Sequence, residues 1–323
     1  MAVELRKAGL HLSGTALWLD ARRKSELSFV SHAHADHIAR HHRVIATAAT
    51  LRLMQHRLGE LDGALAVPYR RPFDLGRLSL ELLPAGHVLG SAQIRVVRED
   101  GTRVVYTGDI NFANATTAER AEIAECDTLV IESTYGHPRY VFPPRAEAFD
   151  RLADWCRHKL ERGVTPVLLC YALGKSQEAI QALSQRGLRL CAHASIHEVC
   201  QIYRELGMPM DVRRFDGHFE EGEVAVFPPQ MARSPHIRRV PHATAALTGW
   251  AVDPNAIARR HGADVAFAIS DHADFPSLVR YARECGASEV ITVHGFAEEF
   301  AKALRAEGII ARAVDRPLQL KLL

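Results

Sequence analysis

The stretch Ser31-His32-Ala33-His34-Ala35-Asp36-His37, directly after the apolar run 27–30, decides how the rest of the chain is interpreted. It holds four potential metal ligands, and imidazole and carboxylate together are the donor set of zinc and its first-row neighbours. The spacing by two would put His32, His34 and Asp36 on one side of an extended segment, whereas His37 would face elsewhere. Two ions side by side fit this pattern better than one ion. The alternative is a histidine-rich surface loop, because the chain holds 18 His.

Length and composition are those of an ordinary globular protein. The 323 residues, 47% of them apolar, suit one large or two medium domains. The 40 basic and 38 acidic residues give a formal charge of +2, so any nucleic-acid surface would be a local patch. Six of the basic residues are Lys and 34 are Arg, which reflects either phosphate binding by guanidinium groups or genome composition.

The cysteines and the first residues of the chain indicate the compartment. The six Cys are scattered without a Cys-x-x-Cys pair, which is typical of buried reduced thiols. Residues 1–12 carry Glu4, Arg6 and Lys7 and lack the continuous apolar segment of a signal peptide or membrane span. We therefore expect a cytoplasmic protein with no membrane partner.

Further candidate donors follow apolar segments that are predicted to be strands. The predicted strands cover 80–83, 103–106, 128–131, 265–269 and 289–293, and the donors that follow them are His87, Asp109, Glu132, His272 and His294. Open α/β sheets present functional groups where strands give way to loops, so these side chains are expected to converge. Asp20 ends a strand pair predicted within 10–20 and would orient a ligand histidine; the alternative is a solvated turn carboxylate.

Seven side chains are enough to hold two ions when one carboxylate is shared. The two sets of three, followed by the shared residue, are His32, His34 and His87, then Asp36, His37 and His294, and finally Asp109. We expect two divalent ions. Zinc is the first choice, with manganese or iron as alternatives, because His and Asp ligands accept all three.

From residue 138 onward the pattern changes to alternating helices and strands. Three prolines between 138 and 144 form a stiff connection, a helix is predicted over 145–162, and a strand is predicted over 166–170. Gly174 then opens a helix whose backbone N–H groups could hold an anion. Weaker candidates for phosphate contact are Ser133, Lys175 and Ser176. The alternation up to about residue 250 predicts a second, smaller α/β unit.

Taken together, these motifs resemble those of the metallo-β-lactamase-fold hydrolases of the β-CASP nuclease family. The segment 32–37, His87 and Asp109 are similar to the motifs of the whole fold, and those similar to the β-CASP motifs are Glu132-Ser133-Thr134, His272 and His294-Gly295. The resemblance covers nearly the whole chain. It implies an α/β fold, in which residues 1–137 and 253–323 form a metallo-β-lactamase αββα sandwich. Residues 138–252 would be an inserted β-CASP α/β cap domain.

The resemblance also implies the chemistry, which is that of a metal-dependent phosphodiester hydrolase. Two ions would lower the pKa of a water molecule and neutralise the charge that develops on the phosphodiester. The metal ligands Asp36 and Asp109 are then catalytic as well. The resemblance assigns His272, paired with Glu132, to protonating or stabilising the leaving oxygen.

Within the family, the chain most resembles bacterial ligase-associated, Artemis-like DNA exonucleases. The resemblance depends on the spacing around 89–93 and 171–175 and on the lack of added RNA-binding domains. It implies DNA-end trimming in repair, at the 5′ end, with DNA-repair proteins such as a ligase or helicase as partners. The alternative is an RNA endonuclease or exonuclease of the RNase J or 3′-end-processing type, because eukaryotic DNA-repair members usually lack the histidine that His294 supplies here.

Two other classes of function fit the sequence less well. A small-molecule hydrolase of the same fold would have no use for a cap domain or for His272. A catalytically silent scaffold protein would be expected to have lost metal ligands, and all seven are present. A nuclease therefore accounts for more of the sequence than either alternative.

Overall fold

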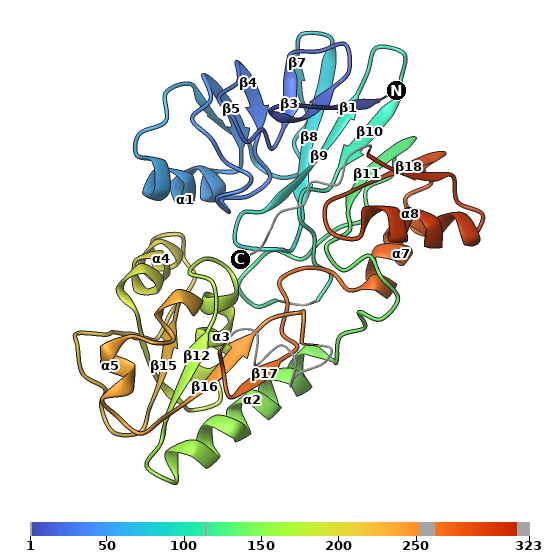
Figure 1. Cartoon of the computed structure of the whole chain (residues 1–323). Coiled ribbons are helices and arrows are strands. Elements are labelled where there is room, and N and C mark those ends of the chain that lie inside the picture. The colour runs from blue at the N-terminus through green and yellow to red at the C-terminus, as the bar shows by residue number, and fades with distance from the viewer. Residues whose placement is uncertain (1, 114, 252–261, 315–323) are drawn as a thin grey trace. The chain divides into compact units, whose positions relative to one another are not determined.

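The structure is a computed structural model that describes residues 2–113, 115–251 and 262–314. The chain divides into two compact units. The first unit comprises Met1–Ala113, Ala118–Arg139 and His272–Leu323, and the second comprises Asn114–Thr117 and Tyr140–Asp271. Each unit is built around its own sheets, and the fold is mixed α/β (Figure 1).

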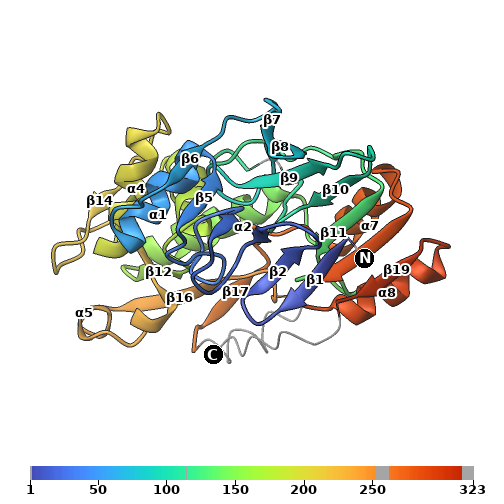
Figure 2. The ribbon, with the colours of Figure 1, turned by 90° about the horizontal axis from the view of Figure 1, so that it is seen from above.

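Two sheets form the framework of the first unit. The first sheet has the spatial order β1 (Val3–Arg6), β2 (Gly9–Leu12), β3 (Leu17–Leu19), β4 (Leu27–Phe29), β5 (Arg43–Ala46) and β6 (Ala64–Ala66). The second has the order β19 (Ala311–Ala313), β18 (Glu289–Val293), β11 (Thr128–Glu132), β10 (Arg103–Tyr106), β9 (Ala92–Val97), β8 (Leu78–Pro84) and β7 (Phe73–Leu75), and Figure 2 shows β8 to β11 side by side.

The parallel half of each sheet positions the candidate donors. In the first sheet β3, β4, β5 and β6 are parallel neighbours, and in the second sheet β10, β11, β18 and β19 are. The carboxyl ends of parallel neighbours meet at the same edge of a sheet. Asp109, Glu132 and His294 therefore leave the second sheet at one edge, as Asp20 and His32 leave the first.

The two sheets of the first unit share one apolar core. Leu12 and Phe29 of the first sheet and Tyr106 and Ile291 of the second are fully buried in this core. The opposite face of the second sheet is covered by α7 (Phe275–Glu284) and α8 (Ala297–Ala306), whose buried side chains pack against strands β10 and β11 (Figure 1). Helix α1 (Ala48–Leu58) begins at Thr47, whose hydroxyl accepts a hydrogen bond from the Thr50 N–H.

The second unit is a parallel sheet with helices between its strands. The spatial order is β14 (Arg213–Arg214), β13 (Arg189–Ala192), β15 (Glu223–Phe227), β12 (Thr165–Leu169), β16 (His242–Leu247) and β17 (Val265–Phe267). All the neighbouring strands in this order pair in parallel. The helices are α2 (Arg145–Leu160), α3 (Lys175–Ser184), α4 (Ala194–Glu205), α5 (Pro235–Arg238) and a short 3-10 helix (Pro229–Met231).

One predicted strand belongs to a different unit from the one expected. Val265–Phe267 was grouped with the first domain, but it pairs with β16 and extends the sheet of the second unit. The pattern of a short apolar strand does not specify its partner, since the partner is chosen by packing. Residues 252–261, on which the expected boundary falls, lie outside the described part of the chain. The division into 1–137 plus 253–323 and 138–252 stays a prediction.

The structure adds two facts on composition. All six cysteines are buried free thiols, as expected from their scattered apolar surroundings. Among the described residues, no helix combines the length and the apolar character that crossing a bilayer requires.

Candidate metal centre

The histidine-rich stretch leaves β4 as an extended segment and then turns. The Val30 N–H still donates to Ile45 O of the neighbouring strand (2.9 Å), and the His37 N–H donates to His34 O (3.1 Å). The expected extended geometry therefore ends at His34. Because of the turn, the ring of His37 lies beside that of His32, with 4.2 Å between the ring centroids, instead of facing elsewhere. Asp36 lies in the turn with a half-exposed side chain.

Asp20 connects the two sheets beneath this stretch. Its Oδ1 accepts from the Ser31 N–H (2.7 Å), and its Oδ2 accepts from the Ser31 hydroxyl (2.6 Å). The same Oδ2 accepts from the Tyr106 hydroxyl and from Nδ1 of His37, both at 2.8 Å. Because carboxylate is only an acceptor, it fixes the His37 proton on Nδ1 and directs Nε2 into the cluster. Asp20 is thus buried and contacts His37, and its role in orienting a metal ligand stays a prediction.

Asp109 lies at the centre of the histidines. Its Oδ2 is 3.5 Å from His32 Nε2, 3.4 Å from His37 Nε2 and 3.7 Å from His87 Nε2. The same oxygen lies 3.9 Å from His272 Nε2. Burial raises the pKa of Asp109 above its usual value, although the charge of His37 acts in the opposite direction. A carboxylate among so many ring nitrogens fits a position that faces one or more cations.

The first predicted set of ligands is assembled in the structure. Donor atoms of His32, His34, His87 and Asp109 all lie within 4.8 Å of one another. His87 Nε2 and His34 Nδ1 are 3.0 Å apart, within hydrogen-bond distance of each other. Burial and the charges of the neighbouring histidines hold the pKa of His32 well below its usual value. His32 is therefore neutral, the form that binds a metal.

The second predicted set is looser. His37 Nε2 lies 3.8 Å from Asp36 Oδ2, and the ring centroids of His37 and His294 are 5.7 Å apart. His294 has a positive φ of 63°, and Asp20 has a φ of 49°. Such backbone strain in residues other than glycine gathers at functional sites. The His294 ring thus lies near the ring of His37 in the histidine-rich stretch.

Unpaired ring nitrogens test whether the site suits a metal. Nε2 of His32 and Nε2 of His294 are buried and have no hydrogen-bond partner among the described residues. Leaving a buried polar atom unpaired costs free energy, and an ion bound at the lone pair removes that cost. Together with the imidazole and carboxylate donors, this observation shows that the residues fit divalent ions such as zinc, manganese or iron.

The buried Glu132 and the partly exposed His272 form a pair at the edge of the cluster. His272 Nδ1 donates to Glu132 Oε1 (2.9 Å), and the Ile110 N–H donates to the same oxygen (2.9 Å). Glu132 Oε2 accepts from the Thr134 N–H (3.1 Å). Burial alone would raise the pKa of Glu132, but the His272 charge and these hydrogen bonds lower it below its usual value. The carboxylate stays ionised and holds the imidazole with Nε2 toward Asp109.

The three weaker candidates for phosphate contact have structural partners. The Ser133 hydroxyl is buried and lies within hydrogen-bond distance of Val293 O and His294 O, where it joins the ends of β11 and β18. Lys175 and Ser176 belong to the second unit, at the beginning of α3. Lys175 Nζ pairs with Asp271 Oδ1 (2.7 Å), and the Ser176 hydroxyl donates to Tyr171 O.

Two contributors to the site were not singled out from the sequence. Ser31 and Tyr106 both donate to Asp20 and so fix the orientation of His37. Ser31 adjoins the histidine-rich stretch and could have been noticed there. Tyr106 ends a strand 86 positions beyond Asp20, and no local sequence pattern connects the two.

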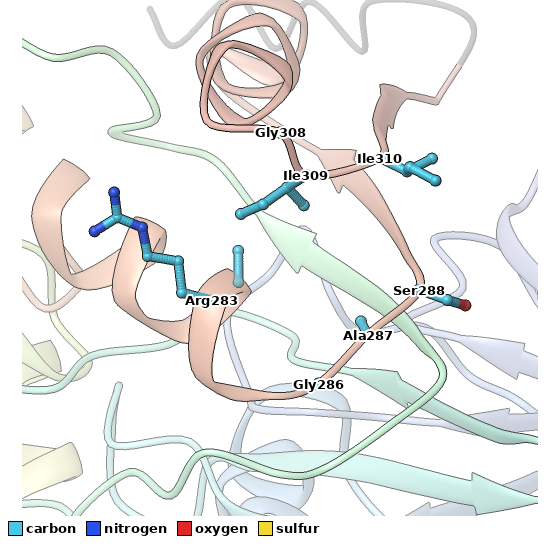
Figure 3. Close-up of a pocket in the computed structure, with 8 residues that line it drawn as sticks. Arg283, Gly286, Ala287, Ser288, Gly308, Ile309 and Ile310 are labelled. Atoms are coloured by element: carbon cyan, nitrogen blue, oxygen red, sulfur yellow. The ribbon is translucent and has the colours of Figure 1, made fainter.

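The first unit also has a surface hollow between residues 282–288 and 308–310. It has a volume of about 350 Å³ and is lined by the turn after α7 and the turn after α8, including Ser288, Ile309 and Ile310 (Figure 3). Arg283 on its wall is paired with Glu307, with 2.9 Å between Nε and Oε2. None of the candidate metal ligands lines this hollow.

The chain is similar to curated proteins that are named as nucleic-acid enzymes. Over 317 residues, 97% of the chain, it is 38% identical to part of a probable DNA ligase from Opitutus terrae, 31% of which is covered. It is 29% identical over 188 residues to RNase aCSPSF2 from Saccharolobus solfataricus, covering 49% of this chain and 38% of that protein. An RNase J-like protein from Methanocaldococcus jannaschii is 39% identical over 98 residues, or 30% of this chain and 23% of that protein.

These similarities are partial in length. The chain spans less than two fifths of each of these three relatives. A crystal structure of a protein of unknown function from Enterococcus faecalis V583 matches 84% of this chain and 76% of its own length, with a TM-score of 0.59 and 12% identity. At that identity the likeness concerns the fold alone. No protein-family model matches the chain.

Proposed function

On the premise that the chain is a member of the β-CASP nuclease family, which its relatives support, we propose that it is a metal-dependent DNA exonuclease. The proposed reaction is hydrolysis of a phosphodiester bond at a 5′ end. The observation that carries the proposal is the position of Asp109, whose Oδ2 lies within 3.9 Å of the Nε2 atoms of four histidines. Two metal ions seated around this carboxylate would match the seven predicted ligands.

The proposed mechanism divides the work between ions and protein. When bound, the ions supply an activated water and neutralise charge on the phosphodiester. His32, His34 and His87 would hold one ion, while Asp20 keeps Nε2 of His37 turned toward the other. The side chains of His32, His87 and Asp109 are buried, so they are held in place by the surrounding protein.

His272 is the proposed proton donor to the leaving oxygen. Its Nδ1 is held by the ionised Glu132, which stabilises the protonated imidazole and fixes its orientation. Its Nε2 faces Asp109 from 3.9 Å and is the atom that can transfer a proton. Transfer by a positioned imidazole is worth roughly 10²–10⁴-fold in rate.

The preference for DNA over RNA is the finer part of the proposal. The similarity that spans nearly the whole chain is to a protein named as a probable DNA ligase, and this supports DNA. The relatives named as RNases match half of the chain or less and support the alternative of an RNA nuclease of the RNase J or 3′-end-processing type. A DNA-repair partner such as a ligase is proposed on the same similarity. We also propose that the fold is a metallo-β-lactamase αββα sandwich with an inserted β-CASP cap domain.

A parallel digestion tests substrate and mechanism together. End-labelled single- and double-stranded DNA and RNA, each with and without a 5′-phosphate, are incubated with the protein and zinc or manganese. We expect DNA to be shortened stepwise from the 5′ end, and preferential cleavage of RNA would overturn the DNA assignment.

The matched pair of variants His272→Ala and His158→Ala tests the proton donor. We expect His272→Ala to lower kcat by roughly 10²–10⁴-fold, while His158→Ala, on the exposed side of α2, leaves it unchanged. Equal rates in both variants would remove His272 from the mechanism.

A further inference from the structure

Arg22 is a cation of the first unit that the metal centre does not explain. It follows Asp20 by two residues, and its N–H donates to Ala8 O (2.7 Å), which fixes the backbone. Its side chain lines a cavity of about 10 Å³ together with Asp20, His37 and His294. A guanidinium group therefore lies beside the second predicted set of metal ligands.

The guanidinium lacks an acceptor within the described part of the chain. Nη2 of Arg22 is buried and has no hydrogen-bond partner. Asp20, the acid that lines the same cavity, has both oxygens engaged by Ser31, His37 and Tyr106. A buried N–H donor without an acceptor is unfavourable, so an acceptor from outside the protein is favoured here.

The positive charge of Arg22 affects the pKa values of His294 and Asp36 in the second predicted set of ligands. Burial lowers the pKa of His294 to about 4, and the charges of His37 and Arg22 add to the shift. Arg22 also contributes, after the charges of His37 and His34, to a lowered pKa of Asp36 against the opposing effect of burial.

We propose that Arg22 binds a non-bridging oxygen of a substrate phosphate on the His37 side of the metal centre, an inference that rests on the proposed nuclease function. The cavity has room for one water-sized group, such as a single phosphate oxygen. The planar guanidinium matches phosphate in charge and in hydrogen-bond geometry. Arg22 is half-buried as a residue, and its buried Nη2 is the atom for which the phosphate oxygen would serve as acceptor.

Arg22 could also affect metal binding, and the experiment has to distinguish this effect from substrate binding. Arg22 would repel a cation held by Asp36, His37 and His294, and its removal could then increase metal loading without any effect on substrate binding. Metal content is therefore measured for every variant, alongside the kinetics.

The test compares Arg22→Gln with Arg22→Lys and with the neighbouring control Arg23→Gln, because Arg23 is exposed. The metal-loaded full chain is assayed on a 5′-phosphorylated, labelled 20-nucleotide single-stranded DNA and on the matching RNA, at several salt concentrations. For Arg22→Gln we expect KM to rise about tenfold, the loss typical of one charge-assisted hydrogen bond. The slope of log KM against log salt should fall by about one, since one phosphate contact is lost.

The controls separate substrate contact from folding and from metal binding. Arg22→Lys, which keeps the charge, should recover the salt slope and part of the KM, and Arg23→Gln should match the unmodified protein. Unchanged KM in Arg22→Gln, with or without a rise in metal content, would overturn the inference while leaving the nuclease proposal intact. If the unmodified protein cleaves neither DNA nor RNA, both proposals are overturned.

Discussion

Among single residues, Asp20 and Asp109 divide the support of the metal centre between them. The carboxylate of Asp20 accepts hydrogen bonds from Ser31, Tyr106 and His37. These bonds would let it orient His37 without binding an ion itself. Asp109 has the opposite surroundings, with its Oδ2 turned toward ring nitrogens. The two buried carboxylates therefore have different surroundings, in line with the different roles that the sequence predicts for them.

Replacement of Asp109 by alanine should abolish cleavage with every metal tested. Groups that only orient metal ligands are worth about 10–100-fold in affinity or activity, and a carboxylate facing the ions should be worth more. We expect metal content to fall and the far-ultraviolet circular dichroism to stay unchanged. Near-normal turnover in this variant would remove the bridging role assigned to Asp109.

Glu132→Gln should make stability less dependent on pH in the acidic range. The folded-state pKa of Glu132 lies below the ordinary value of 4.5, because the His272 charge and hydrogen bonds outweigh burial. A lowered carboxylate pKa contributes stability that is fully present above pH 4.5 and is lost as the pH falls through the lowered value. The unmodified protein should therefore exceed the variant in unfolding free energy at pH 7.

Urea unfolding of both proteins at several pH values between 3 and 7 measures this difference. We expect the gap to be constant from pH 7 to about pH 5 and to narrow below it. A gap that widens as the solution becomes more acidic would contradict an ionised Glu132 in the folded protein.

At the scale of elements, the ends of parallel strands and the turns after them hold the site together. The end of β11 is joined to the end of β18 through the Ser133 hydroxyl, and Phe296 N–H donates to Ser133 O (2.8 Å). Gly295 makes this approach possible, because a Cβ there would lie 2.4 Å from Ser133 O and 2.4 Å from Thr134 Cα. Its φ of +49° is also in the left-handed region.

Gly295→Ala should destabilise the fold and displace His294. The matched control is Gly308→Ala, which shares a positive φ (+82°) but has nothing within 4 Å of its Cβ position. Gly308→Ala should lower the free energy of unfolding by about 1 kcal/mol, because alanine is disfavoured at a positive φ. Gly295→Ala should lower it by at least about 2 kcal/mol more, because backbone atoms have to move. Denaturant unfolding of both variants measures the difference, and equal costs would show that the β11 and β18 turns are not tightly packed.

On the scale of the whole molecule, the two units are stabilised by different kinds of polar cluster. The first unit buries histidines and carboxylates that form the candidate metal centre. The second unit buries an ionic cluster in which Arg145 pairs with Glu178 and also donates to Ser270 O. Lys175 and Asp271 form a further buried pair in this unit. Burial lowers the pKa of Arg145 to about 10, against the effect of Asp271, so the guanidinium keeps its charge at pH 7.

Glu178→Gln should destabilise the second unit and spare the metal centre. Removing one partner of a buried ion pair leaves an uncompensated charge and costs about 3–5 kcal/mol. The exposed pair Asp154–Arg157 on α2 offers a control, and Asp154→Asn should cost less than about 1 kcal/mol. Calorimetric unfolding and metal content are the measurements. A loss of bound metal in Glu178→Gln would show that the units do not act independently.

Much of the fold and the candidate metal ligands could be predicted from the sequence, because an apolar run followed directly by His, Asp or Glu is a local pattern. Apolar runs predicted the strands 128–131 and 289–293, and the residues directly after them are the candidate donors Glu132 and His294. The helix at 297–306 was likewise predicted from its periodicity and appears as α8. These features depend on contacts within a few residues, which is why a single sequence is sufficient for them.

Other features were decided only by the tertiary structure. The turn after His34 brings His37 against His32, Tyr106 reaches Asp20 across 86 positions, and Val265–Phe267 joins β16 instead of a strand of the first unit. Each depends on which distant segments pack together, and a local sequence pattern does not specify that. The sequence by itself therefore determined the identity of the donors, and tertiary packing decided which atoms they present and which charges, Arg22 among them, surround them.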